Sequence, residues 1–82
     1  MKVLRTPKMR TLLREGKRKA TGNPPSEGNM IGLIHRTEKN GWHYQVEWIH
    51  DIRLKPEPYV VVYAFRPPRN FCARAADYYL EG

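Results

Sequence analysis

A predicted β-hairpin over Asn29–His50 constrains the fold of this 82-residue chain more than any other stretch. Asn40-Gly41 stands between two strand-like runs. This dipeptide favours a type I′ turn, because both residues tolerate a positive φ. A two-residue loop fixes the register of the strands. The expected pairs are Lys39 with Trp42, Thr37 with Tyr44, His35 with Val46, Leu33 with Trp48 and Ile31 with His50.

This register divides the hairpin into an apolar and a mixed face, because side chains alternate along a strand. We expect the apolar face to form the core together with Tyr79 from the C-terminal part of the chain. The predicted core residues are Trp42, Tyr44, Val46, Trp48, Leu33, Ile31 and Tyr79. The opposite face is expected to be exposed, and to carry Ile34, Arg36, His43, Gln45, Glu47 and Ile49.

A third strand and a final helix are predicted after the hairpin. Tyr59–Phe65 is apolar almost throughout, which indicates a strand that is central or covered on both faces. It is expected to run antiparallel to the second strand, because the connection is too short for a crossover. Apolar residues from Cys72 to Leu80 recur at helical spacing, so the sequence predicts a helix over about 71–80. The predicted fold is therefore α+β: a three-stranded antiparallel sheet with a C-terminal helix packed on one face, plus a short N-terminal helix or basic arm.

Positive charge is concentrated at the N-terminus. The net charge is +7, and residues 1–20 hold eight Lys or Arg against the single acid Glu15, whereas Lys/Arg and Asp/Glu balance over 21–82. We therefore divide the chain into a basic arm (1–22), a linker (23–28) and a body (29–82). Thr6-Pro7 predicts a helix start, and the helix is expected over about 7–15 because Gly16 weakens the pattern. The alternative is an arm that becomes ordered only on its partner.

No enzymatic chemistry is indicated by the sequence. Cys72 is the only cysteine, which excludes an internal disulfide and two-cysteine metal motifs. No histidine pair has the spacing of metal ligands, and no nucleophile motif or phosphate-binding glycine loop is present. We predict neither cofactor nor metal. The absence of a long apolar run or a signal peptide predicts a cytoplasmic protein without membrane association.

The predicted β-β-β-α order resembles the DNA-binding domain of plant ethylene-response factors and the arm-binding domains of phage-type integrases. Ile31-Gly32-Leu33 is similar to the start of that family's first strand, and Trp42 with Val46 is similar to its Trp-x-x-x-Ile. Phe65 and Ala73–Asp77 look like the end of its third strand and its helix. The resemblance implies a sheet that lies in the major groove of duplex DNA. The chain departs from it at the reading face, where Arg36 is the only cation and Glu47 would repel phosphate.

A double-stranded RNA-binding fold is the other arrangement considered. An N-terminal helix at Thr6–Glu15 would give the α-β-β-β-α order of that family. The resemblance is limited, because the chain lacks a lysine cluster at the start of its last helix. It also has a tight Asn40-Gly41 turn where that family has a long loop.

Two functions follow from these patterns. The first is nucleic-acid binding, with duplex DNA favoured over RNA, because a one-sided basic arm is typical of such proteins. The arm would contact phosphates and the body would position it. The alternative is a non-enzymatic protein-binding module, such as a small phage-type inhibitor, adaptor or assembly protein, that docks through its sheet face. The predicted nucleic-acid-binding residues are Lys8, Arg10, Arg14, Lys17, Arg18, Lys19, Arg36, Arg53 and Lys55.

Overall fold

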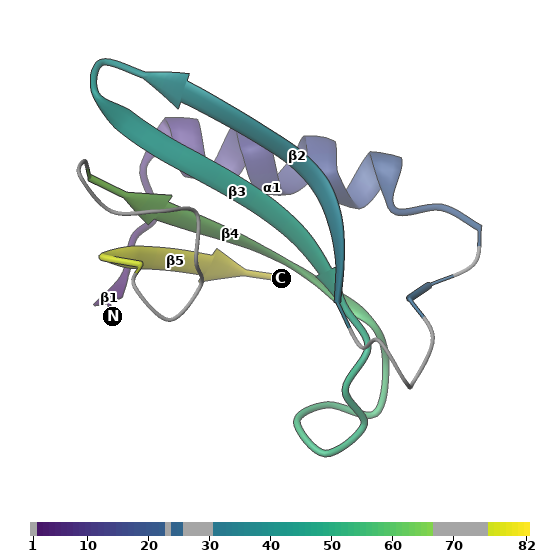
Figure 1. Ribbon diagram of the computed structural model, residues 1–82. Coiled ribbons are helices and arrows are strands. Elements are labelled where there is room, and N and C mark those ends of the chain that lie inside the picture. The colour runs from purple at the N-terminus through teal and green to yellow at the C-terminus, as the bar shows by residue number, and fades with distance from the viewer. Residues whose placement is uncertain (1, 23, 26–30, 67–75) are drawn as a thin grey trace.

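The computed structural model describes residues 2–22, 24–25, 31–66 and 76–82. Within these ranges the protein is α+β, with a five-stranded mixed sheet and a helix packed on one face (Figure 1). The elements are β1 (Lys2–Val3), α1 (Pro7–Lys19), β2 (Ile31–Lys39), β3 (Trp42–Ile49), β4 (Tyr59–Phe65) and β5 (Tyr78–Glu81). The strand order is β1-β5-β4-β3-β2, and neighbouring strands are antiparallel except β1 and β5, which are parallel.

The predicted three-stranded sheet with a C-terminal helix is wrong. Tyr78–Glu81 is strand β5, which pairs with β4, and the helix that covers the sheet is the N-terminal α1. Tyr78 and Leu80 pack on the core beneath α1, whereas Tyr79 packs on the opposite side of the sheet. The apolar residues at this end therefore follow the two-residue period of a strand. Residues 71–75 of the predicted helix lie outside the described residues.

The predicted turn is confirmed, because Asn40 has a φ of 53° and Gly41 a φ of 80°. The three predicted pairs nearest the turn are also confirmed. A β-bulge between Leu33 and His35 then shifts the register, so that Leu33 lies opposite Glu47 and not Trp48. Ile31 shifts in the same way and lies opposite Ile49.

The bulge corrects the predicted core. Ile31 and Leu33 turn to the face away from α1, where each remains 53% exposed. Ile34 turns instead toward the helix side, where it packs against the core. A one-residue insertion moves every preceding side chain to the other face, which explains why two predicted core residues are exposed.

Apolar side chains pack on both faces of the sheet. The cluster beneath α1 contains Met9, Leu12, Val46, Val60, Val62, Ala64 and Leu80, with Trp42, Tyr44 and Trp48 partly buried against it. The cluster on the opposite face contains Ile49, Val61, Tyr63, Phe65 and Ala76, with Tyr59 and Tyr79 partly buried against it. Strand β4 contributes to both clusters, which confirms the prediction of a strand covered on both faces.

Helix α1 is longer than predicted because Gly16 is a packing residue. Thr6 caps the helix, and its hydroxyl oxygen accepts a hydrogen bond of 3.3 Å from the backbone N–H of Met9. Met9, Leu12 and Gly16 are buried against the sheet. A Cβ at Gly16 would lie 2.6 Å from Val46 Cγ1. The missing side chain therefore allows α1 to approach β3 closely, and the helix continues to Lys19.

Candidate nucleic-acid interface

The outer face of α1 is the most concentrated basic surface that the structure describes. Six of the nine predicted site residues belong to this helix: Lys8, Arg10, Arg14, Lys17, Arg18 and Lys19. All except Lys8 are exposed, because the helix turns Met9, Leu12 and Gly16 toward the sheet. Glu15 is the only acid in the helix. We call this surface the basic face of α1.

Three arginines form a line along this face. Arg10, Arg14 and Arg18 recur at intervals of four residues, which places them on one side of the helix. The line extends about 12 Å along the helix axis, with Lys17 next to its C-terminal end. Lys17, Arg18 and Lys19 occupy the last turn, where positive charge interacts favourably with the helix dipole.

Lys8 contributes to the basic face differently. It is partly buried, and its ammonium nitrogen lies 5.8 Å from the centre of the Tyr44 ring. A cation at this distance from an aromatic ring is attracted by the electron-rich face of the ring. Lys8 is therefore held against β3 on the helix side of the sheet, whereas the exposed arginine line points into solvent.

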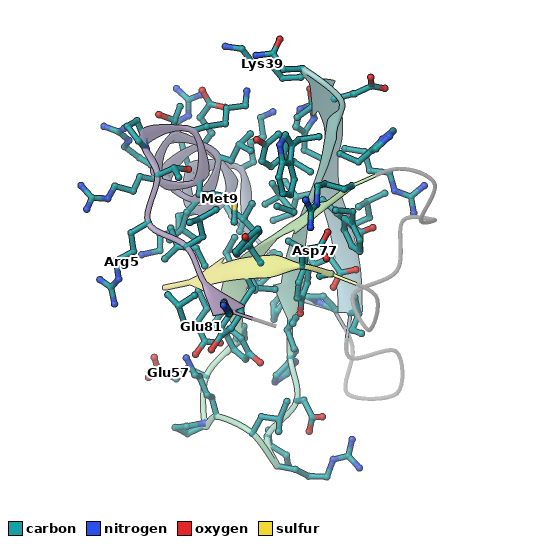
Figure 2. The ribbon with its side chains drawn as sticks, turned by 90° about the vertical axis from the view of Figure 1, so that its left-hand side faces the viewer. Arg5, Met9, Lys39, Glu57, Asp77 and Glu81 are labelled. Carbon is teal, nitrogen blue, oxygen red and sulfur yellow. The ribbon has the colours of Figure 1, made fainter. Side chains whose placement is uncertain are left out.

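Two further cations were missed by the sequence prediction. Lys2 in β1 and Arg5, just before α1, are both exposed, and Figure 2 shows Arg5 on the same side of the sheet as the helix. Both belong to the basic N-terminal arm, outside the predicted set of site residues. Arg5 could have been identified from the predicted helix start, because it directly precedes the cap residue Thr6, whereas the position of Lys2 depends on the pairing of β1 with β5.

The other three predicted site residues do not join the basic face. Arg36 lies opposite Gln45 in the β2–β3 ladder, on the face of the sheet away from α1. Lys55 is paired with Glu81, with 3.2 Å between Nζ and Oε1, and its ammonium group lies 4.4 Å from the centre of the Tyr59 ring.

Arg53 is held by a carboxylate in its own loop. Its Nε and one terminal guanidinium nitrogen each donate a hydrogen bond of 2.9 Å to the carboxylate of Asp51. The side-chain hydrogen bond from Arg53 is the main cause that lowers the pKa of Asp51. The three predicted site residues of the body are thus separated from the helix, and Arg53 and Lys55 each have an acidic partner.

The face of the sheet away from α1 is not the exposed reading surface that the sequence predicted. Gln45, Glu47 and Ile49 are only 3%, 7% and 7% exposed. The side-chain amide of Gln45 donates a hydrogen bond to the carboxylate of Glu47. Burial raises the pKa of Glu47, while the Gln45 hydrogen bond and the charge of Arg36 lower it to a smaller extent. This face is largely closed to a polyanion at its centre.

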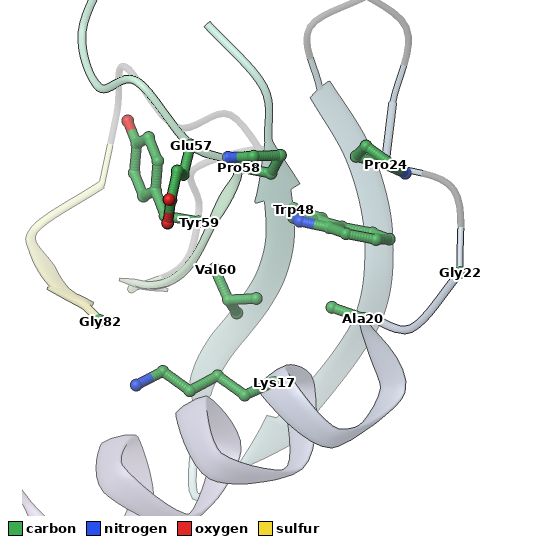
Figure 3. A pocket seen from close by; sticks show the side chains of 10 residues that line it. All are labelled: Lys17, Ala20, Gly22, Pro24, Trp48, Glu57, Pro58, Tyr59, Val60 and Gly82. Atoms are coloured by element: carbon green, nitrogen blue, oxygen red, sulfur yellow. The ribbon is translucent and has the colours of Figure 1, made fainter. Parts of the chain in front are cut away.

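A shallow hollow lies beside the C-terminal half of α1 (Figure 3). Its volume is about 560 Å³, and Lys17, Trp48, Glu57 and Tyr59 are among its lining residues. Figure 3 shows Lys17 rising from the helix and Trp48 crossing from β3. Lys17 and Glu57 bring an ammonium group and a carboxylate to this hollow from distant elements. Its partly buried tryptophan provides a fluorescent reporter next to the basic face.

Comparison of the chain with protein families, with curated proteins and with solved structures found no match. In the part of the chain that the structure describes, no group of three or more His, Cys, Asp or Glu side chains could hold a metal ion. Of the described residues, no helix is long and apolar enough to cross a membrane.

Proposed function

We propose that this protein binds duplex nucleic acid, and that the basic face of α1 makes the phosphate contacts. The observation that carries the proposal is the arrangement of Arg10, Arg14 and Arg18 in one exposed line, with one acid in the whole helix. Neutralising phosphates releases condensed counterions, which is the main source of affinity in non-specific binding.

The docked helix supports a rigid binding surface. Met9 and Leu12 anchor α1 in the core, and Gly16 holds it close to β3 and β4. A surface that is ordered before binding loses less conformational entropy on association than a disordered arm. In this proposal the sheet is the scaffold that positions the helix, in place of the three-stranded reading surface expected from the sequence.

Duplex DNA is the favoured target. The major groove of B-form DNA is about 12 Å wide and admits an α-helix, whereas the major groove of A-form RNA is deep and narrow. An α-helix with its side chains is about 10–12 Å across, and α1 exposes one long side. The proposed location is the cytoplasm, where a lone cysteine stays reduced.

Fluorescence anisotropy with labelled duplex DNA and duplex RNA across a salt series tests the proposal. If Arg10, Arg14, Lys17 and Arg18 each neutralise one phosphate, log K should fall against log[salt] with a slope of about −3.6 on B-form DNA. The double variant Arg14→Gln/Arg18→Gln should reduce the slope by about 2, because two phosphate contacts are lost. Glutamine has nearly the helix propensity of arginine, so α1 should remain folded.

The matched control is Lys39→Gln/Lys55→Gln, which removes the same charge from the hairpin tip and from the β3–β4 loop. This control should leave the slope unchanged. An equal reduction of the salt slope in the two variants would show that binding depends only on net charge, and would contradict the assignment of the basic face. No binding to either duplex at low salt would refute the proposed function.

A further inference from the structure

The outer edge of β2 is an accessible strand edge. Among the described strands, β2 pairs with β3 on one side and with no strand on the other (Figure 1). His35, Arg36, Glu38 and Lys39 are exposed along it. An edge strand presents backbone N–H and C=O groups that can pair with another chain. The β-bulge at its other end interrupts the regular ladder, so the regular part of this edge runs from His35 to Lys39.

The turn determines which backbone groups point outward. Lys39 and Trp42 flank the two-residue turn, so they form a hydrogen-bonded pair. Hydrogen-bonded and non-bonded pairs alternate along an antiparallel ladder. Thr37 therefore directs its N–H and C=O toward β3, whereas Arg36 and Glu38 direct theirs outward.

This alternation restricts how two copies of the edge can pair around a two-fold axis. Outward-directed residues must meet outward-directed residues, so the axis passes through a residue of the strand. An axis at Arg36 or at Glu38 would place like charges directly opposite each other, which is destabilising. An axis at Thr37 places Arg36 of each copy opposite Glu38 of the other.

We propose that a second copy of this chain binds along β2, antiparallel and centred on Thr37. Arg36 and Glu38 lie on the same face of the sheet, since their partners in β3 are Gln45 and His43. The Glu38 carboxylate, which is exposed, lies 3.9 Å from Nδ1 of His43 in its own chain. The dimer would therefore contain two cross-strand pairs of opposite charge, together with the backbone hydrogen bonds of two Arg36–Glu38 pairs. Self-complementary charge along one exposed edge is what favours a second copy over an unrelated strand.

The other face of the edge is compatible with this register. Centring on Thr37 places Lys39 of one copy opposite His35 of the other. Glu15 and Lys19 of α1 line a small hollow together with His35, so one carboxylate and one ammonium group lie near the position that the incoming lysine would take, and this face adds no net charge preference to the register. The dimer goes beyond the proposed nucleic-acid function, and its test does not require nucleic acid.

Cysteine cross-linking tests the register directly. In a Cys72→Ser background, Thr37→Cys would place the two sulfurs at a non-hydrogen-bonded pair, where the Cα atoms are about 4.5 Å apart. This distance lies within the range of disulfides. We expect rapid formation of a disulfide-linked dimer under mild oxidation. The matched control is His35→Cys, which should not cross-link because its two copies are offset along the strands.

Charge exchange tests the chemistry of the edge without a covalent bond. Sedimentation velocity over a concentration series should show a reversible dimer of the native chain. Glu38→Arg should weaken the dimer about tenfold or more, because both opposite-charge pairs become like-charge pairs. Arg36→Glu/Glu38→Arg should restore it. Glu57→Arg, which makes the same charge change in an exposed loop, should leave the dissociation constant of the dimer unchanged.

Several results would overturn the proposal. A native chain that is monomeric at every concentration would refute it, as would equal cross-linking at positions 37 and 35. The pairing would also be refuted if Glu38→Arg dimerised as well as the native chain, or if the exchanged variant stayed monomeric while its circular dichroism showed a native fold.

Discussion

Replacing Gly16 by alanine is expected to destabilise the protein, although the same change usually stabilises a helix. Alanine is favoured over glycine in a helix interior by about 1 kcal/mol. At Gly16, however, the new Cβ would lie 2.6 Å from Val46 Cγ1 and 3.0 Å from Val60 Cγ1, whereas carbon atoms in contact are about 3.5–4.0 Å apart. Both valines are fixed in the sheet and buried, so they have little room to move.

The expected size of the effect follows from these two opposing contributions. Inserting a methyl group into a packed core costs about 1–3 kcal/mol, and the short contact to Val46 favours the upper part of that range. After the gain in helix propensity, Gly16→Ala should lower the free energy of unfolding by about 1–2 kcal/mol. For a domain of this size, the melting temperature should fall by about 5 °C or more.

Urea unfolding followed by circular dichroism measures this change through the midpoint at constant m-value. Thr11→Ala, on the exposed side of α1, is the control and should stabilise slightly through helix propensity. In a double-mutant cycle, Val46→Ala should reduce the penalty at Gly16, because it removes the methyl group that the new Cβ meets. A Gly16→Ala variant more stable than the native protein would refute the close approach of α1 to the sheet.

Three further changes test the packing and the electrostatics. Thr6→Ala should lower the free energy of unfolding by about 1 kcal/mol, because the cap to the N–H of Met9 is lost; urea unfolding measures it, and no change would contradict the cap. Met9→Ala should cost about 2–5 kcal/mol and more than replacing an exposed residue such as Ile31, since Met9 is 0% exposed; equal unfolding midpoints would contradict this. Because the pKa of Glu47 is higher in the folded than in the unfolded protein, the folded state is favoured at low pH, where this side chain is protonated. This stabilisation is present below the pKa of the unfolded state and is lost as the pH rises through the pKa of the folded state. Glu47→Gln should therefore raise the urea midpoint at pH 7 relative to the native chain and have less effect near pH 4; the opposite order would refute a raised pKa.

The parts of the fold that were predicted correctly are encoded locally. The turn follows from the backbone preferences of Asn40 and Gly41, and the double-sided burial of β4 follows from its continuous apolar run. The start of α1 follows from Thr6 and Pro7, whose cap needs no distant partner. In each case the residues that carry the signal lie within, or next to, the structural element that they determine.

The bulge in β2 could not be located from alternation alone. Leu33 and Ile34 are adjacent apolar residues, so either one can face the core. The register fixed at the turn selects Leu33, whereas packing beneath α1 selects Ile34. Which of the two residues faces the core depends on packing against α1, which is distant in the sequence. The pattern of the hairpin alone therefore does not determine it.

The C-terminal prediction failed for a related reason. Tyr79 and Leu80 fit either the end of the predicted helical face or a short strand, because two adjacent residues do not distinguish the two periods. The strand is selected by pairing with β4 on one side and with β1 on the other. The sequence likewise predicts that Gly16 weakens the helix. In the structure, its missing side chain allows α1 to pack closely against β3 and β4, which are distant in the sequence.

The candidate site was predicted in part. The charge of the basic face can be read from composition, and the helical spacing of Arg10, Arg14 and Arg18 follows once α1 extends beyond Gly16. The pairing of Arg53 with Asp51 and of Lys55 with Glu81 depends on loop and sheet geometry. The sequence therefore shows where positive charges occur along the chain, but not which of them have an acidic partner in the fold.

The parallel pairing of β1 with β5 has a consequence for the order in which the protein folds. Lys2 pairs with Tyr78, so this contact joins opposite ends of the sequence, whereas the β2–β3 hairpin closes over two residues. Closing a long loop costs more entropy than closing a short one, and distant contacts form slowly. The hairpin is therefore expected to form early and β1 to join the sheet late. Until β3 and β4 are in place, α1 has no surface on which to bury Met9 and Leu12, so the basic face becomes rigid only after the central strands have paired.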